Sequence, residues 1–244
     1  MKLNGILGVT VNAAMNRRVK KGIALLSLLF ICIPFCAAEI TFSPGIGGTV
    51  HTVQSFFEIQ NAEDPEHSVV SEKAVTYIIP VPSSGLDIHF THESSGFTLS
   101  VINNIGFPIT LFKKGGFGNE TQRVIGFILD EQVLFGYTYG VKQPFSIHFG
   151  IGPGAVLGHF WTLQNVQISE NVYYTVTPIA LHLGVQYLFT QHVGIAIGIH
   201  DMLGVSGIFL SDKSSNSSAE KRKVTGTVGL GNTFTLRIAA TLRF

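Results

Sequence analysis

The feature that most constrains this chain is a two-residue alternation that runs through residues 225–244. Successive side chains of a β-strand point to opposite faces, so this segment is predicted to be one long strand with an apolar face and a polar face. Strands of globular proteins usually have only about 5–6 residues, which makes its length unusual. The apolar positions are Val228, Leu230, Phe234, Leu236, Ile238, Ala240, Leu242 and Phe244, and Asn232 is the exception.

The same alternation recurs in residues 145–161, 179–189 and 193–206. In each segment an aliphatic and aromatic face lies opposite a face of small, polar or histidine side chains. Charged residues make up only 13% of the chain, against about 25% in soluble domains. A soluble barrel would turn its apolar face inward, whereas this composition favours lipid outside and a narrow polar lumen inside.

No segment after residue 38 has the pattern of a membrane helix. Residues 171–200 contain no Asp, Glu, Lys or Arg, but Pro178 interrupts them and their hydrophobic period is two. In lipid, only helices and closed barrels satisfy every backbone N–H and C=O group. The chain is therefore predicted to be an all-β, antiparallel transmembrane β-barrel.

Short turn signals give the number of strands. They fall at residues 94–96, 140–144 and 190–192, so the following strands should begin near Phe97, Phe145 and Val193. These starts are 48 residues apart, which predicts four hairpins and eight strands. Longer polar connections are expected at residues 61–73, 113–122, 163–171 and 211–223.

Short turns at one end and long loops at the other are typical of outer-membrane barrels, with the long loops extracellular. We therefore expect both termini to be periplasmic. Aromatic residues should lie at the two membrane interfaces. They are Phe97, Tyr137, Tyr139, Phe145, Tyr187, Phe189 and Phe244 near the turns, and Phe112, Trp161, Tyr173 and Phe209 near the loops.

The first 38 residues are predicted to be a signal peptide. A basic cluster at residues 17–21 precedes an apolar run at 22–35, and small residues follow. This is the order of a secretory signal, and about 14 apolar residues are too few for a membrane span of roughly 20. Cleavage is expected after Ala38, with Ala37 as the alternative, and Met15 is a plausible true start. The barrel would then occupy residues 39–244.

Removal of residues 1–38 changes the charge of the chain. Five of the 16 basic residues lie there and none of the 15 acidic ones, which leaves 11 basic residues against 15 acidic ones and a net charge of −4. Nucleic-acid-binding proteins usually carry a basic patch, so no nucleic-acid partner is expected. Cys32 and Cys36 are also removed, so the mature protein has no disulfide.

The final strand, residues 233–244, resembles the end of small outer-membrane barrels, with Ile238, Ala240 and Leu242 alternating before a terminal Phe244. Strand number and hydrophobic character most resemble the OmpW/OprG group and its spirochaetal relatives. The resemblance implies that the last strand is a signal for the barrel-assembly machinery, and that small hydrophobic molecules pass through a lateral opening in the wall. The assembly signal would comprise Phe234, Leu236, Ile238, Leu242 and Phe244.

Seven charged or histidine side chains are predicted to project into the lumen. Because buried charges need partners, we expect a network in which Arg237 pairs with a carboxylate and the histidines satisfy hydrogen bonds. Imidazole is a common metal ligand, but these histidines lie on separate strands without ligand spacing, so no metal and no cofactor are predicted. A proton-sensitive gate is a third interpretation. The seven are Asp87, His89, Asp130, His148, His182, His200 and Arg237.

Pro80 and Pro82 interrupt the approach to a strand at residues 86–90. Proline cannot donate to a strand ladder, so these residues either end the first loop or create a lateral weak point between strands 1 and 2. Simple alternation turns Glu131, Asp201 and Asn103 towards lipid. We therefore expect a bulge beside each acidic residue, or a position near the rim.

No enzymatic activity is predicted, because the adjacent His200 and Asp201 would point to opposite faces. The predicted function is a small outer-membrane channel or carrier for small hydrophobic molecules. The alternatives are a surface-exposed adhesin or ligand-binding barrel with a plugged lumen, and a purely structural barrel. Outer-membrane lipid, the barrel-assembly machinery and a small hydrophobic solute are the expected partners. The pattern predicts neither the solute nor the oligomeric state.

Overall fold

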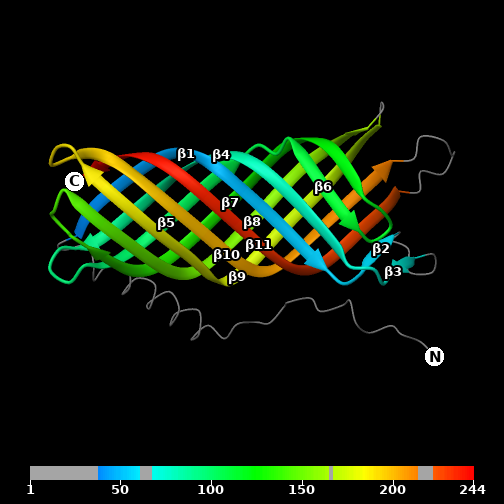
Figure 1. Ribbon diagram of the computed structural model, residues 1–244, viewed down its shortest axis with the longest axis horizontal. Coiled ribbons are helices and arrows are strands. Elements are labelled where there is room, and N and C mark those ends of the chain that lie inside the picture. Colours follow the sequence, from blue (N-terminus) through cyan, green and yellow to red (C-terminus); the bar gives the residue numbers. More distant parts are fainter. Residues whose placement is uncertain (1–37, 61–67, 165–166, 214–221) are drawn as a thin grey trace, which may run out of the picture. The chain divides into compact units, whose positions relative to one another are not determined.

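The computed structural model describes residues 38–60, 68–164, 167–213 and 222–244. They form one antiparallel sheet that closes on itself as a barrel of tilted strands (Figure 1). No helix in these ranges has the length and hydropathy to cross a membrane. The strands are β1 (Ala38–Ser55), β2 (Glu58–Gln60), β3 (Val69–Ser71), β4 (Val75–His92), β5 (Phe97–Gly106), β6 (Thr110–Gly115), β7 (Glu120–Tyr139), β8 (Phe145–Gln164), β9 (Gln167–Leu188), β10 (Val193–Lys213) and β11 (Arg222–Arg243).

Eight strands form the ring, as the turn spacing predicts. β2 continues β1 along β11, because β1 pairs with β11 up to Gln54 and β2 pairs with it at Ile59 and Gln60. β6 continues β5 in the same way, since both lie between β4 and β7. β3 pairs with β2 beyond the ring. The predicted strand starts at Phe97, Phe145 and Val193 are confirmed.

The barrel closes between its first and last strands. The backbone N–H of Ile40 donates to the Phe244 carbonyl at 3.1 Å, and the N–H of Phe244 donates to the Ile40 carbonyl at 2.9 Å. This seam lies at the same end as the short turns, which we call the turn end; the opposite end is the loop end. Gly96 and Gly140 have positive φ angles of 72° and 81°, a conformation that glycine adopts without steric cost.

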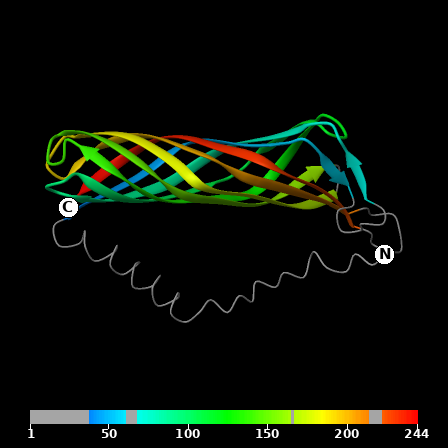
Figure 2. The same cartoon turned by 90° about the horizontal axis from the view of Figure 1, so that it is seen from below.

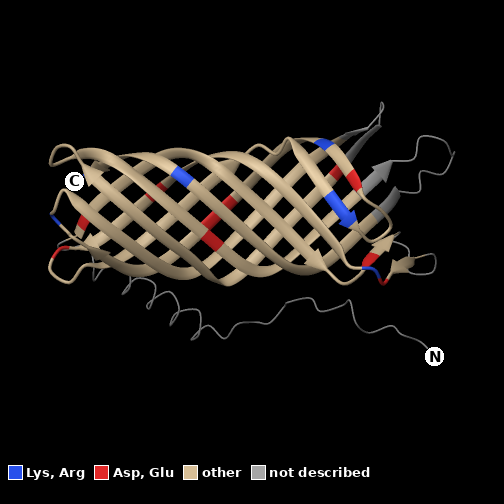
Figure 3. Cartoon of the chain, viewed as in Figure 1, with Lys and Arg blue, Asp and Glu red and all other residues tan. Residues whose placement is uncertain are grey.

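The outer face of the barrel is apolar over the part that adjoins the turn end. Along β10, Val193, Ile195, Ile197, Ile199, Leu203 and Val205 are all exposed. Charged residues gather mainly at the two ends (Figure 3). β9 and β11 have 22 residues each, about twice the 9–11 that cross a bilayer. The loop end therefore extends well beyond the apolar band.

One predicted loop needs correction, and the predictions for the N-terminus fall outside the described residues. Residues 163–171 were expected to be a polar loop, but Leu163 pairs with Ile168 and Gln164 with Gln167, so the β8–β9 hairpin is nearly all strand. Hydrogen bonding along these two long strands continues past the point where the apolar alternation ends. The predicted signal peptide and the start at Met15 fall on residues 1–37, outside the described residues.

Candidate functional site in the barrel lumen

The lumen is divided into two layers of different chemistry. The loop-end half is filled by apolar side chains, and Tyr77, Phe160, Tyr173, Met202 and Ile208 are among those less than 2% exposed. The narrow polar lumen that the sequence predicts is present in the turn-end half, whereas in the loop-end half the prediction was wrong. Towards the loop end, both faces of several strands are apolar, as at Val124 and Ile128 inside and Ile125 outside.

Hydroxyl groups line the turn-end half. Ser43 and Thr241 bond across the closing seam at 3.0 Å between their side-chain oxygens, and Thr98 bonds Thr138 at 2.8 Å. All four lie on the inner face of the barrel. They are short side chains, so they leave space at the axis for larger groups.

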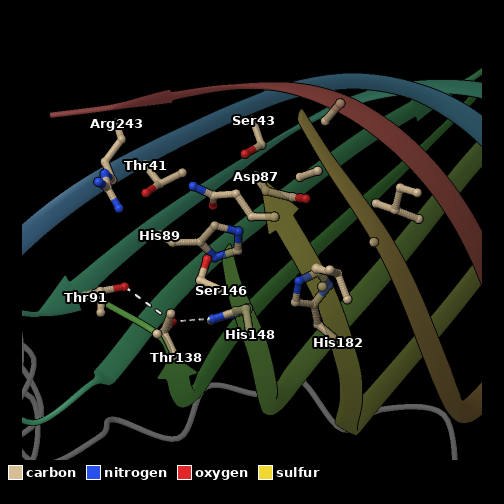
Figure 4. A pocket seen from close by; sticks show the side chains of 18 of the residues that line it. Thr41, Ser43, Asp87, His89, Thr91, Thr138, Ser146, His148, His182 and Arg243 are labelled. Atoms are coloured by element: carbon tan, nitrogen blue, oxygen red, sulfur yellow. Dashed lines mark hydrogen bonds between the residues drawn. The ribbon is translucent and has the colours of Figure 1, made fainter. Parts of the chain in front are cut away.

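Four histidine rings lie next to one another across this half of the lumen, tilted against each other; we call them the histidine stack. The ring centroids of His89 and His148 are 4.2 Å apart, those of His148 and His182 are 5.0 Å apart, and those of His182 and His200 are 4.4 Å apart. The rings come from β4, β8, β9 and β10. Figure 4 shows His89, His148 and His182 turned into one space, with Asp87 beside it.

Each histidine is held by a hydrogen bond. His89 Nδ1 bonds Ser100 Oγ at 2.9 Å, and His148 Nδ1 bonds Thr138 Oγ1 at 2.9 Å. Ser100 Oγ also reaches His148 Nε2 at 2.9 Å. His182 Nδ1 and His200 Nδ1 are 3.1 Å apart. The rings are therefore fixed in orientation by partners on neighbouring strands.

A charged layer separates the histidines from the apolar core. Arg237 forms an ion pair with Asp87 and donates from Nη1 to Asn104 Oδ1 at 2.6 Å. Asn104 in turn donates to Asp130 Oδ2 at 3.1 Å, and Gln132 donates to Asp130 Oδ1 at 3.2 Å. The layer contains two carboxylates and one guanidinium, so its formal charge is negative.

The structure places all seven sequence-predicted lumen residues inside the barrel, each between 1% and 9% exposed. His89, His148, His182 and His200 form the stack, and Asp87 and Arg237 adjoin it. Asp130 lies further along the axis, linked to the pair through Asn104. Sequence reasoning missed His51, Asn104 and Gln132, which are equally buried. The alternation around His51 is weak because outward-facing Thr52 and Gln54 are polar, and this hid the inner face of β1.

A second buried charge cluster lies at the loop end and was also missed. Glu58, which is 0% exposed, pairs with Lys113 Nζ at 2.8 Å. It also accepts hydrogen bonds from Tyr77 Oη at 2.5 Å and from the Phe117 backbone N–H at 2.9 Å. This cluster ties β2 to β4 and β6 at the loop end.

Two cavities adjoin the wall and the lumen. The first, of about 30 Å³, opens towards the turn end and is lined by Asp87, His89, His148 and His182. Such a volume suits an ion or one to two water molecules. The second is an apolar hollow of about 610 Å³ in the wall, lined by Ile46, Gly47, Pro82, Ser83, Ser84, Phe107 and Ile238. We call it the wall hollow.

Pro80 and Pro82 lie within β4, and the strand continues through both. β4 pairs with β6 up to Ile78 and with β5 from Ser83 onwards. Between these ladders, the Phe107 N–H donates to the Pro82 carbonyl at 3.1 Å. The ladder is therefore interrupted between the second and third strands of the ring, whereas the expected weak point was between the first and second.

The outward-facing polar residues are paired in the structure. Asn103 donates to Glu131 at 3.2 Å, directly across β5 and β7. Asn232 donates to Asp201 at 2.7 Å. A register shift lies between Met202 and Val205, next to Asp201, as expected. The pairings of Glu131 with β5 and β8 show no register shift, so the bulge predicted there was wrong.

The aromatic residues expected at the turn end are all exposed on the outer face. They surround the rim where a membrane interface would lie. Tyr173 was expected at the loop-end interface, but it is 0% exposed and bonds Thr175 at 2.7 Å inside the lumen. Its side chain belongs to the apolar core.

Residues 36–244 match a protein family described as a domain of unknown function, DUF2715. The chain belongs to the DUF2715 family. No curated protein matches this DUF2715 member. Among solved structures it is similar to the outer membrane protein OprG from Pseudomonas aeruginosa, with a TM-score of 0.57, 13% identity and coverage of 85% of this chain and 96% of OprG.

Two further solved structures are similar to this DUF2715 member at lower TM-scores. Neisserial surface protein A has a TM-score of 0.41, 10% identity and coverage of 84% of this chain and 97% of its own. The outer membrane protease OmpT from Escherichia coli has a TM-score of 0.37, 8% identity and coverage of 84% and 97%. The similarity to OprG shows that this chain has the β-barrel fold of that outer membrane protein.

Proposed function

We propose that this protein is a small outer-membrane carrier or channel for small hydrophobic molecules, with release through the side of the barrel. The observation that carries the proposal is the wall hollow. Its lining residues Ile46, Phe107 and Ile238 are exposed on the lipid-facing surface, and an interrupted ladder adjoins it at Pro82. A hydrophobic solute would be stabilised there by burial of its apolar surface.

The route in this proposal does not run straight through the barrel. Arg237, Asp87 and the histidine stack close the turn-end half, where the cavity is about 30 Å³. An eight-stranded barrel has an interior that side chains nearly fill. The loop end would be extracellular and both termini periplasmic. Because the apolar core fills the loop-end half of the lumen, the solute would be bound and released at the wall hollow rather than pass along the lumen.

A bulky side chain in the wall hollow tests this proposal. Ser84 is exposed and lines the hollow, so Ser84→Phe should place a ring in it and obstruct it while changing stability by no more than about 0.5 kcal/mol. We expect uptake of a small apolar fluorophore, N-phenylnaphthylamine, by cells that produce this variant to fall to the level of cells without the protein. Fluorescence of intact cells measures it.

Ala155→Phe is the matched control, because Ala155 is also an exposed small residue but lies on β8, away from the hollow. It should leave uptake unchanged. Equal uptake by the Ser84→Phe variant and the unmodified protein, at equal amounts in the outer membrane, would contradict a route through this hollow.

A second candidate function is ligand binding at the surface by a barrel with a plugged lumen. The filled loop-end half, with Phe160 and Tyr173 fully buried, specifically favours it. Liposome swelling with graded solutes separates the two functions, because a plugged barrel gives no swelling with any solute.

Neither proposal includes catalysis: His200 is buried in the lumen, while Asp201 bonds Asn232 near the outer face.

We further propose that the barrel-assembly machinery reads the last strand through Phe234, Leu236, Ile238, Leu242 and Phe244. All five side chains are exposed on the outer face. Phe244 also contacts Phe42 edge to face, with ring centroids 6.0 Å apart, beside the closing backbone bonds.

Deletion of Phe244 should therefore strongly reduce the folded barrel in the outer membrane, because it removes the terminal aromatic and two seam hydrogen bonds together. The amount of folded barrel is measured as the fraction of the protein that stays folded in unheated detergent gels. Phe189→Ala is the control, since Phe189 is an exposed aromatic at the same end of the barrel. An equal yield for the deletion and the control variant would count against the proposal.

A further inference from the structure

The histidine stack brings three ring nitrogens near enough to one another to hold a metal ion. His89, His148 and His182 each offer one nitrogen, and these three atoms lie within 4.8 Å of one another. All three side chains are buried. We propose that this trio, which we call the His triad, binds one divalent transition-metal ion, with zinc as the first expectation.

The chemistry of the ligands selects the class of ion. Imidazole suits zinc, copper, iron and nickel, whereas calcium and magnesium prefer oxygen ligands. Residues 39–244 contain no cysteine, so no thiolate competes for a soft ion. Zinc–nitrogen bonds of about 2.0–2.1 Å bring three ligand nitrogens to roughly 3.4 Å from one another in a tetrahedral site. Binding therefore requires the ring nitrogens to move closer by up to about 1.4 Å.

The second nitrogen of each ring already has a partner, as it does in most histidine metal sites. Nδ1 of His89 bonds Ser100, and Nδ1 of His148 bonds Thr138. These contacts direct Nε2 of both rings towards the ion. Ser100 also bonds Nε2 of His148, and the metal would replace that one bond.

The third ligand, His182, is oriented by His200. Nδ1 of His182 lies 3.1 Å from Nδ1 of His200, and Nε2 of His200 lies 3.4 Å from Arg237 Nη2 and 3.9 Å from Asp87 Oδ2. Metal binding at Nε2 of His182 selects the tautomer in which its Nδ1–H donates to His200. His200 is then protonated on Nε2, so it gives up the 3.4 Å contact with the Arg237 guanidinium and its Nε2–H can turn to Asp87. A carboxylate partner of this kind raises the basicity of the ligand.

The charges beside the histidine stack and the opening of the small cavity also suit a bound cation. Asp87, Asp130 and Arg237 lie on the side of the stack towards the apolar core, and their sum is one negative charge. The cavity of about 30 Å³ touches all three histidines and opens towards the turn end past Thr41 and Thr91 (Figure 4). An ion can therefore enter from the turn end, and water can fill its fourth coordination position.

The test uses the protein extracted from membranes in detergent, without a polyhistidine tag and freed of metal by a chelator. Titration calorimetry with zinc chloride should give one ion per chain. Cobalt chloride should produce the visible absorption of a tetrahedral nitrogen-ligated ion. His89→Gln and His182→Gln should each weaken zinc binding at least about tenfold and remove the cobalt bands.

Two more variants separate ligation from folding. His159→Gln is the matched control, because His159 lies outside the lumen and pairs with Glu170 at 2.8 Å; it should bind zinc as the unmodified protein does. Thr138→Val keeps all three rings but removes the partner of His148 Nδ1, and should weaken binding about tenfold. Absence of stoichiometric zinc binding, or equal binding by the His89→Gln and His159→Gln variants, would overturn the proposal.

Discussion

Arg237→Met should destabilise the barrel by about 3–5 kcal/mol, the cost of leaving a buried charge without its partner. Arg237 and Asp87 are 1% and 4% exposed and face each other from β11 and β4. Without the guanidinium, the Asp87 carboxylate would have no cation beside it and Asn104 would lose its donor at 2.6 Å. Urea unfolding of the barrel in lipid vesicles, followed by tryptophan fluorescence, measures the change.

The double variant Arg237→Met with Asp87→Asn should recover most of this loss, because it removes both charges together. Arg243→Met is the control: Arg243 lies at the turn end, where its Nε is 3.6 Å from Glu39, and a less buried pair of this kind contributes about 0–1 kcal/mol. If the Arg237 and Arg243 variants unfold at the same urea concentration, the ion pair in the lumen does not stabilise the barrel.

The outer face and the strand starts could be predicted from sequence because they depend on local rules. Turn residues end each strand, and a period of two selects one face. Phe97, Phe145 and Val193 follow short turns, and the structure places a strand start at each. No knowledge of neighbouring strands is needed for either inference.

The contents of the lumen depend on relations between strands, which a single sequence does not contain. The His triad forms only because the registers of β4, β8 and β9 bring His89, His148 and His182 to one level. That level also depends on a register shift between Gly152 and Gly154 in β8. The sequence indicates which face each histidine occupies, but not how far along the axis it lies.

The apolar core was missed for a different reason. A period-two pattern identifies an inner face only when the two faces differ in polarity. In β4, the stretch from Val75 to Val81 is apolar at Tyr77 and Ile79 inside and at Ile78 outside. The loss of alternation was itself a signal of the apolar core. A strand that is apolar on both faces contacts apolar groups on both sides, here lipid outside and the core inside.

Phe160→Ala tests that interpretation of the core and should destabilise the barrel by about 3–5 kcal/mol, the usual cost of truncating a buried phenylalanine. Phe160 is 0% exposed and lies on the lumen face of β8. Its removal leaves a cavity among side chains such as Ile128 and Tyr173, which belong to the same cluster. Unfolding in lipid vesicles measures the loss, as for Arg237.

Phe149→Ala is the matched control for this experiment, since Phe149 is on the same strand but is 49% exposed on the outer face. Lipid chains can fill the space that its ring leaves, so its truncation creates no cavity and should cost clearly less. A barrel whose loop-end half held water would lose similar stability from both variants. A much larger loss for Phe160→Ala would mean that the loop-end half is a solid core, which closes the straight path along the barrel axis.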